Sequence, residues 1–468
     1  MAFRHGVYKR EVPTSIIAPA QSEAGLPVII GTAPVFMSDK ECVNIPKLVY
    51  TYEEAVKIFG YSSDWANYTL CEFIYSQFAL FGQSPAVLIN VFDPEAHKQV
   101  ITNDGEGETY LAVDGRVSLG PGVMSADDYE LLYDDEGNAY ISTSAAGIKI
   151  KTITKAKPEL VTPNDIIGGV NAQSGKYTGL EIVNQIFPKF RLIPGLIGAP
   201  GWSENSSVAA VMRAKADNIS GVFTGLCIVD IPCGSNGAKV YTDAPNWKNT
   251  HNFTAERMIA CWPKIALDGK VFHMSTQLIG LMNKVDAAHS DIPYKSPSNE
   301  SLQMDSCVDD AGEEVTLTLE QANYLNGQGI TTALNWSGGW KSWGNRTAAY
   351  PANTDTKDCF ISVRRMFDFI GNQFILTFWQ KVDQPMTPRL VRAVVNTFNM
   401  YMNSLVAIEA LLGGRIEFRE DENSITELLD GKMSFHLFIT PPSPAEVIES
   451  VLEYDPEYLS VLYEAVRN

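Results

Sequence analysis

The stretch TPRLVRAVVNTFNMYMNSLVAIEALLGG, from Thr387 to Gly414, carries the clearest structural signals in the chain. Thr387 is a suitable N-cap, Pro388 stands at the first helical position, and Gly413-Gly414 suits a left-handed C-terminal cap. The apolar residues between these ends recur at spacings of three and four, which places them on one stripe of an α-helix. They are Leu390, Val394, Phe398, Tyr401, Leu405, Ile408 and Leu412. The sequence therefore predicts a long helix with one buried face.

Two short segments of period two follow this helix. The first has Ile416 and Phe418 on one side, and the second has four alternating apolar residues before Pro441-Pro442. These four are Met433, Phe435, Leu437 and Ile439. Because the side chains of a strand point alternately to its two faces, each segment is predicted to be a half-buried strand, which the prolines end in the second case.

Two further signals complete this part of the chain. Ser424 and Glu427 have the spacing of a capping box, which predicts a short helix between the two strands. A third apolar run, over residues 446–454, places Ile448 and Leu452 on one face. We therefore expect the long helix to pack on a small, mostly antiparallel sheet. Such a unit is suited to supporting other molecules and not to turning over a substrate.

Composition and charge limit the classes of protein to consider. The chain has 468 residues, of which 45% are hydrophobic, enough for roughly three domains with their own cores. Its net charge of −19 argues against nucleic acid as a direct partner, because such binding depends on lysine and arginine contacts to phosphates. No apolar stretch approaches the ~18 residues of a membrane span, and MAFRHGVYKR lacks the apolar core of a signal peptide. We expect a soluble protein that stays in the cytoplasm, without membrane insertion.

Residues 1–24 are predicted to form an extended arm. Pro13 and Pro19 oppose a helix, and the segment has no period of 3.6. Fully extended, two dozen residues would reach on the order of 80 Å, far enough to contact a neighbouring molecule. From composition alone, a frayed terminus is an equally good interpretation. The candidate residues for linking subunits are Val7, Tyr8, Val12, Ile16 and Ile17.

The alternation of buried strands with amphipathic helices predicts an α/β multidomain protein. LPVIIGT and AVLINVF, with two helices between them, open a central α/β domain over residues 25–92, and the same alternation returns over 178–350. Residues 93–177 interrupt it with an acidic, turn-rich composition that predicts an inserted β-rich outer domain. The long helix and its strands form a C-terminal α+β domain over 351–454, and residues 455–468 form a C-terminal arm. The apolar residues of that arm are Tyr458, Leu459, Val461 and Leu462.

Asp230 is the strongest catalytic candidate. It ends the apolar run LCIVD, and open α/β sheets place ligands at the carboxyl ends of their strands. A nucleophile nearby would need an oriented histidine. The thiols and hydroxyl close to Asp230 in sequence are Cys227, Cys233 and Ser235, and no motif ties them to His251, His273 or His289. The alternative is a structural residue at the end of a strand, and we expect no catalytic residue.

Metal and phosphate sites have little support in the sequence. Cys227 and Cys233 lack the second ligand pair of a zinc site, and NWSGGW and NGQG lack the lysine of a phosphate loop. The seven cysteines are odd in number and scattered, so we predict reduced, mostly buried thiols. No metal or cofactor is expected.

Two pairs of arginines are candidates for contacts with partners. Arg364-Arg365 could bind an acidic partner surface or the carboxylates of its own domain, and the sequence favours neither. Arg389 and Arg392 lie at the start of the long helix, off its apolar stripe. They are candidates for a weak, salt-sensitive contact with another protein, or ordinary solvated charges of a helix.

Several motifs, taken in their order along the chain, resemble contractile tail sheath proteins. The carboxyl half carries WGNRT from Trp343, VRRMFDFI, GG-x-I-x-F and PPSPAEVIESVLEYDPEYL. The amino-terminal part carries HGVYKREVPTSI, SEAGLPVIIGTAPV and LIPGLIGAPGWSENSSVAAVMRAKAD. The resemblance covers nearly the whole chain except about residues 93 to 177. Proteins of this family form the sleeves of myophage tails, R-type bacteriocins and related injection machines.

This resemblance implies a structural subunit that polymerises helically around an inner tube and contracts to drive the tube through a target cell envelope. The implied partners are other copies of the chain, the inner tail tube protein, and baseplate and tail terminator proteins. The implied location is a virion tail or particle sheath assembled in the cytoplasm of a bacterial host, and Arg389 and Arg392 would face the tube. Two alternatives stay open, which are a cytoplasmic α/β enzyme with a strand-end site at Asp230 and a non-contractile shell protein.

Overall fold

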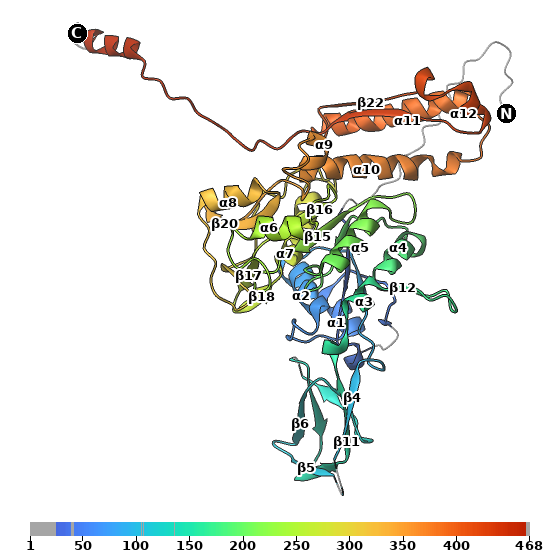
Figure 1. Ribbon diagram of the computed structural model, residues 1–468, viewed down its shortest axis with the longest axis vertical. Coiled ribbons are helices and arrows are strands. Elements are labelled where there is room, and N and C mark those ends of the chain that lie inside the picture. Colours follow the sequence, from blue (N-terminus) through green and yellow to red (C-terminus); the bar gives the residue numbers. More distant parts are fainter. Residues whose placement is uncertain (1–24, 39–41, 104, 106, 135, 465–468) are drawn as a thin grey trace, which may run out of the picture.

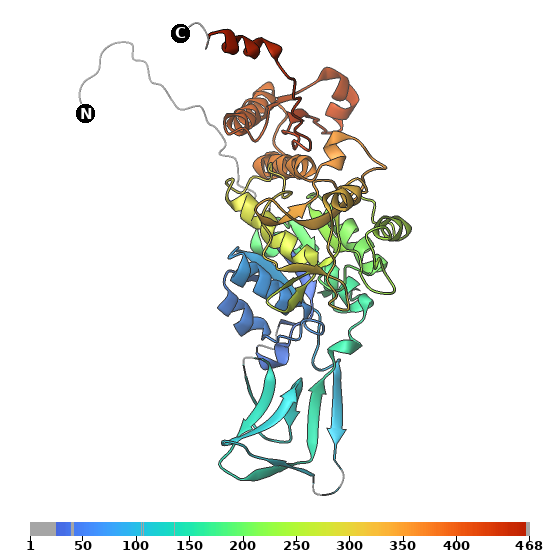
Figure 2. The same ribbon diagram turned by 90° about the vertical axis from the view of Figure 1, so that its left-hand side faces the viewer.

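The protein is elongated, with a large sheet and its helices at the centre (Figures 1 and 2). The computed structural model describes residues 25–38, 42–103, 105, 107–134 and 136–464. The predicted arm residues Val7, Tyr8, Val12, Ile16 and Ile17 lie outside these ranges. The described part is a mixed α/β structure with several sheets.

The central sheet has eight strands in the order β2-β3-β1-β14-β15-β16-β20-β21 within the described residues. The strands from β3 to β20 run parallel, and β2 and β21 are antiparallel edge strands. Every residue of the five inner strands from β3 to β16 is buried, which explains why these strands are continuous apolar runs. The bounds are β1 Pro27–Gly31, β2 Lys47–Val49, β3 Ala86–Asn90, β14 Leu196–Gly198, β15 Leu226–Asp230, β16 Met258–Cys261, β20 Ile330–Trp336 and β21 Gly339–Trp343.

Helices cover both faces of this sheet (Figures 1 and 2). They are α1 Tyr52–Phe59, α2 Thr69–Ile74, α3 Pro163–Ile167, α4 Val183–Phe190, α5 Ser206–Asp217, α6 Ala244–Thr250, α7 Met274–Ala287 and α8 Leu319–Asn326. α2 continues into a π-helical turn, Tyr75–Leu80. α7 is buried around almost its whole circumference, because it lies between the sheet, this turn and the C-terminal helices. The strands and helices predicted from LPVIIGT, TYEEAVKIFGY and AVLINVF are confirmed.

The segment between β3 and α4 is built mainly of short antiparallel strands, and its part over residues 98–156 projects from one end of the molecule (Figure 1). Its own apolar cluster includes Val117, Val123 and Ile150. The strands are β4 Lys98–Thr102, β5 Glu108–Leu111, β6 Arg116–Pro121, β7 Val123–Ala126, β8 Leu132–Tyr133, β9 Asn138–Ser142, β10 Gly147–Ile150, β11 Thr152–Ala156, β12 Gly169–Val170 and β13 Tyr177–Thr178. A further antiparallel sheet, in the central part, contains β17 Lys264–Leu267, β18 Lys270–Phe272 and β19 Ser306–Val308.

The opposite end of the molecule consists of two long helices and a hairpin (Figure 1). The elements are α9 Thr356–Cys359, α10 Ile361–Phe378, α11 Pro388–Ala407, β22 Gly413–Glu417, α12 Ile425–Leu429 and β23 His436–Thr440. The side chain of Thr387 accepts a hydrogen bond from the Leu390 amide at 3.2 Å, so the predicted start of the long helix is confirmed. The capping box of Ser424 and Glu427 is confirmed as well. Phe374 of α10 meets Phe398 of α11 edge to face, with ring centroids 5.2 Å apart.

The predicted end of the long helix is wrong. α11 ends at Ala407, where Glu409 takes the left-handed conformation with φ of 60° and Ala410 bonds back to Leu405. Ile408 and Leu412 are therefore exposed and not part of the buried stripe. Gly414 instead allows close packing between β22 and α11. A Cβ there would lie 3.1 Å from the sulfur of Met402, where β22 crosses α11.

The third apolar run, over residues 446–454, does not join the C-terminal sheet. The hairpin of β22 and β23 is a two-stranded sheet, and the described residues 446–454 have no regular secondary structure. Ile448 is 90% exposed and Leu452 is 93% exposed. The apolar pattern is present, but no surface of the described residues covers it.

Buried ion pairs join α10 to the central part. Arg365 forms a bidentate pair with Asp286 of α7, with one N–O distance of 3.0 Å, and both side chains are at most 5% exposed. Arg364 bonds to Asp358 and Asp368, each at 3.0 Å. The hypothesis that Arg364-Arg365 binds a partner surface is therefore wrong, because both guanidinium groups are buried and paired with carboxylates of the same chain.

Asp368 extends this network across to the sheet. Its carboxylate also accepts from the Arg257 guanidinium at 2.9 Å and from the Thr224 hydroxyl at 3.0 Å. Arg257 and Thr224 flank the starts of β16 and β15. α10 is thus tied to two strands and to α7.

Replacing Arg365 by Met should destabilise the protein by about 3–5 kcal/mol, because it leaves the Asp286 carboxylate buried without its counter-charge. Arg392→Met, the same change at an exposed position of α11, should cost less than about 0.5 kcal/mol. Urea unfolding followed by tryptophan fluorescence measures both. The double variant Asp286→Leu with Arg365→Met should recover most of the loss, and equal destabilisation by the single and double variants would contradict this account.

Candidate functional site

Asp230 lies at the carboxyl end of β15 and is 3% exposed. Its carboxylate accepts hydrogen bonds from the Ser203 hydroxyl at 3.1 Å and from the Ser275 amide at 2.9 Å, and the Ser275 hydroxyl also donates to it. Ser275 belongs to the first turn of α7, where a negative charge satisfies free amides and complements the helix dipole. Asp230 therefore caps α7 from the neighbouring strand, and its oxygens are occupied by protein donors.

His273 lies just before α7 and is hydrogen-bonded to Glu72. Its Nδ1 is 2.8 Å from one Glu72 oxygen, and its backbone amide donates to the other at 2.7 Å. Burial by itself would lower the pKa of His273, but the charge of Glu72 and the hydrogen bond to it prevail and raise the pKa to about 9. Glu204 faces the other ring nitrogen at 3.7 Å. This pairing could not be predicted from a sequence motif, because Glu72 and His273 are 201 residues apart.

Lys264 completes the charged cluster beside Asp230. Its ammonium lies 2.7 Å from Asp310 and 3.5 Å from Glu204. Burial opposes the charge of Lys264, but these carboxylates outweigh it and raise its pKa. The charges of the cluster are paired with one another, which is the arrangement of a structural network.

The cysteine thiols near this cluster are unsuited to nucleophilic attack. Burial raises the pKa of Cys227 well above its usual range and that of Cys233 to about 12, so both are protonated at neutral pH. All seven cysteines are buried thiols, as predicted. Within the described residues, no group of three or more His, Cys, Asp or Glu side chains is arranged to hold a metal ion.

The largest of the described cavities lies next to the charged cluster. It has a volume of about 850 Å³, opens widely to solvent and is lined by Trp202, Glu204, Trp247 and Asp310 among others. Trp247 stacks on His251 with ring centroids 4.0 Å apart, so the aromatic face is already covered.

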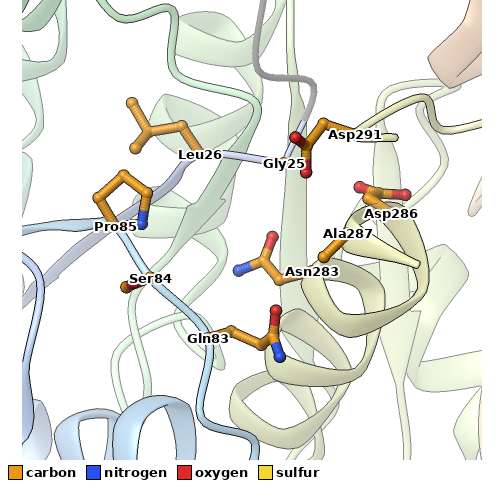
Figure 3. A pocket seen from close by; sticks show the side chains of 9 residues that line it. All are labelled: Gly25, Leu26, Gln83, Ser84, Pro85, Asn283, Asp286, Ala287 and Asp291. Atoms are coloured by element: carbon orange, nitrogen blue, oxygen red, sulfur yellow. The ribbon is translucent and has the colours of Figure 1, made fainter. Parts of the chain in front are cut away.

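A second cavity, of about 90 Å³, lies where the described chain begins (Figure 3). The amide group of Asn283 on α7 points into it, and within the described residues both amide atoms lack a hydrogen-bond partner. Gly25 passes so close that a Cβ there would lie 2.7 Å from Asn283 Oδ1 and 3.0 Å from Asp286 Oδ2. A side chain at this position would have to displace the Asn283 amide, so the first described residue lies close against α7.

The candidate residues on α11 are exposed as expected. Arg389 and Arg392 lie in its first two turns, off the stripe that packs on α10. The Nε of Arg392 donates to the Pro388 carbonyl at 3.1 Å. In Figure 1 this helix lies at the end of the molecule opposite the β4–β11 segment.

The candidate residues of the C-terminal arm are exposed but not extended. Residues Pro456–Ser460 form a 3-10 turn and Val461–Glu464 form α13, after Asp455 has capped the turn. Tyr458 is 76% exposed and Leu462 is 65% exposed, and Leu459 and Val461 are exposed as well. In Figure 1 the tail leaves the body and carries α13 away from it. The described tail therefore presents apolar side chains to solvent, which indicates a surface for a partner.

The hairpin of β22 and β23 is a second incomplete surface. Each strand pairs only with the other within the described residues, so both outer edges are open. Open edges offer unpaired amides and carbonyls to an added strand. The alternating pattern of Met433 to Ile439 predicted the strand but not that its sheet would stop at two.

The His273 pairing predicts a pH dependence of stability. Because the folded pKa of about 9 exceeds the unfolded value of 6.5, the folded protein binds more protons in this window. Stability should therefore be greatest below pH 6.5 and fall by up to the order of 3 kcal/mol as pH rises through 9. In His273→Gln this fall should be absent.

The test uses the difference in stability between wild type and His273→Gln at each pH. Lys248 is 1% exposed and burial lowers its pKa to about 8, so its own contribution rises with pH and opposes that of His273. It is present in both proteins and cancels in the difference. The groups that face His273 are Glu72, Glu204, Lys264 and Asp230. If the urea midpoints of wild type and His273→Gln change in parallel between pH 6 and 9.5, the assignment of a protonated His273 is refuted.

No described helix is long and apolar enough to cross a lipid bilayer.

Comparisons with known proteins agree with the motifs. No protein-family model matches the sequence. The chain is 27% identical to the tail sheath protein of Burkholderia phage BcepMu, in an alignment that covers 98% of each chain. It is 22% identical to the tail sheath protein of Escherichia phage P2, over 66% of this chain and 74% of that protein.

Two solved structures share the fold. One is a chain from the baseplate of the anti-feeding prophage, with 17% identity and a TM-score of 0.60 over 97% of this chain and 100% of that one. The other is from the contracted sheath complex of the extracellular contractile injection system PVC, with 13% identity and a TM-score of 0.60 over 98% and 99% of the two chains. The resemblance to contractile tail sheath proteins, which short motifs indicated, is confirmed along the length of the chain.

Proposed function

We propose that this chain is the structural subunit of a contractile sheath, which polymerises helically around an inner tube and contracts to drive that tube through a target cell envelope. The observation that carries the proposal is similarity to a phage tail sheath protein over 98% of both chains. Two features of the described chain support it, namely the open edges of the β22–β23 hairpin and the exposed apolar tail. Both suit an assembly and neither suits a monomeric enzyme.

The shape of the molecule suggests how the subunit is oriented in a sheath. The α10–α11 end and the β4–β11 end lie at opposite ends of the elongated molecule (Figures 1 and 2). If Arg389 and Arg392 contact the inner tube, the β-rich segment must face the outside. We propose the units 25–92 with 178–350, 93–177 and 351–454 on this basis, flanked by arms over 1–24 and 455–468.

The two arms are proposed to link neighbouring subunits by adding to their open sheet edges. Main-chain hydrogen bonds of this kind persist while other contacts are exchanged, as contraction requires. A head-to-tail contact that repeats without closure gives a helix, and one that closes gives rings that can stack. Contraction would then release a kinetically trapped extended state, without a nucleotide.

We further infer that the protein acts structurally and not as an enzyme. Asp230 is buried and bonded to Ser203 and Ser275, and His273 is engaged by Glu72. The remaining proposed partners are baseplate and tail terminator proteins, and the proposed location is a virion tail or particle sheath assembled in the cytoplasm of a bacterial host.

Deleting residues 1–20 should leave a folded monomer that no longer forms tubes or rings, since it removes none of the described residues. Negative-stain electron microscopy over a range of concentration and salt, with and without an inner tube as template, measures assembly. Circular dichroism and thermal unfolding report the fold. A second variant keeps the full length and replaces Val7, Val12, Ile16 and Ile17 by Ser. Like the deletion, it should form neither tubes nor rings. Tubes formed by the arm-less protein would exclude the linking role of the arm.

Charge reversal at Arg389 and Arg392 to Glu should weaken co-assembly with the cognate tube protein, and the loss should be largest at low salt. The control carries the same change of charge at Arg116 and Lys176, exposed residues of the β-rich segment. Co-sedimentation with tubes at 50 and 300 mM salt compares the two. Equal binding by both variants would show that this end of α11 does not contact the tube.

A further inference from the structure

The C-terminal tail is tied to the body by one ion pair at its root. Arg346 Nε donates to Glu446 Oε1 at 2.7 Å, and the terminal nitrogen NH2 contacts Oε2. This is the bidentate fork of arginine on a carboxylate, which sets direction as well as distance. After Glu446 the described chain is exposed, with Val447 82% and Val451 87% accessible.

Arg346 is itself held from every side. Its NH1 contacts the Cys359 sulfur at 2.9 Å, and its guanidinium lies 3.9 Å from the ring centroid of Phe360 and 4.4 Å from that of Tyr350. The side chain is 15% exposed. A lysine at this position would keep the charge but lose both the fork and the stacking.

The backbone around Arg346 is equally fixed. Thr347 donates to the Cys359 carbonyl and Ile361 donates to the Asn345 carbonyl, both at 2.9 Å. These bonds join the segment after β21 to the start of α10. Arg346 is therefore mounted on a rigid junction and not on a free loop.

The tail root is stiff between its two fixed points. β23 ends at Thr440 and Glu446 is clamped, with Pro441, Pro442 and Pro444 between them. Proline restricts φ and lowers the freedom of such a segment. Residues 442–447 also form one wall of an open cavity of about 610 Å³, whose opposite wall includes Trp343 and Tyr350.

We infer that Arg346 is a positioning residue, which fixes where and in which direction the tail leaves the body so that a second copy of the chain can capture it. This inference rests on the proposed linking role of the tail. Beyond the clamp, the stretch from Val447 to Asp455 can span roughly 30 Å at ~3.3 Å per residue. A fixed origin reduces the volume that the apolar end must search and the ordering cost when it binds.

The test separates the clamp from the tail. Glu446→Gln removes the charge of the pair and keeps its shape, and Arg346→Lys keeps the charge and removes the fork. Glu449→Gln is the matched control, an identical change at an exposed residue three positions further on. Tail deletion after Glu446 reports whether the tail links subunits at all.

Two readouts are needed. A dye on Ser450→Cys, which the seven buried cysteines leave as the accessible thiol, reports tail motion in the monomer by fluorescence anisotropy. Sedimentation reports the critical concentration for tubes or rings. Glu446→Gln and Arg346→Lys should lower the anisotropy and raise the critical concentration roughly two- to fivefold, the range expected for a partly exposed ion pair. Glu449→Gln should change neither quantity, and thermal unfolding should stay unchanged in Glu446→Gln.

The outcomes are distinguishable. Tail deletion that abolishes assembly, with Glu446→Gln and Arg346→Lys behaving as wild type, overturns the positioning role alone. Tail deletion that leaves assembly intact overturns the linking role proposed above and the inference with it. If Arg346→Lys fails to fold, Glu446→Gln decides, because it changes a side chain at the surface.

Discussion

The buried ion pair between Arg365 and Asp286 is the interaction on which the arrangement of this molecule depends. It joins α10 to α7, and α7 in turn packs along the central sheet. The network of Arg364, Asp368 and Arg257 fixes the same helix to the starts of two strands. Because α11 and the hairpin pack on α10 and on each other, their orientation relative to the sheet is set by these pairs. A buried pair of this kind contributes less to net stability than to a unique geometry.

The two ends of the described body lie near residues that contact α10 or the residue before it. The described chain begins at Gly25, where a Cβ would lie 3.0 Å from Oδ2 of Asp286, the partner of Arg365. It leaves at Glu446, which Arg346 holds while resting on Phe360, the residue before α10. Arms that link subunits would pull on these two points during contraction. Their common base means that such a load reaches the same rigid helix.

The polar cluster around Asp230 shows how an enzyme-like position can serve a structural purpose. It lies at the carboxyl ends of parallel strands, where α/β enzymes bind ligands. Here the position is filled by protein groups, with Ser203 and Ser275 on Asp230 and Glu72 on His273. The result is a capped α7 and a charged network that stabilises the folded chain below the pKa of His273.

Local elements of this protein could be predicted from the sequence because their causes are local. Thr387 with Pro388, and Ser424 with Glu427, encode helix starts through bonds within one turn. The apolar runs at 26–32 and 86–92 encode strands buried on both faces. The size of the C-terminal sheet and the partner of Arg365 were decided by tertiary structure.

Those features depend on contacts between residues far apart in the chain. Arg365 meets a carboxylate 79 residues away and Arg346 meets one 100 residues away, separations at which spacing carries no signal. The run at 446–454 shows the converse case, since its apolar pattern is written in the sequence but no surface within the described chain receives it. Sequence alone determined which segments form helices and strands and which are apolar. Only tertiary structure decided which charges are buried together, because burial and pairing are properties of the packed chain.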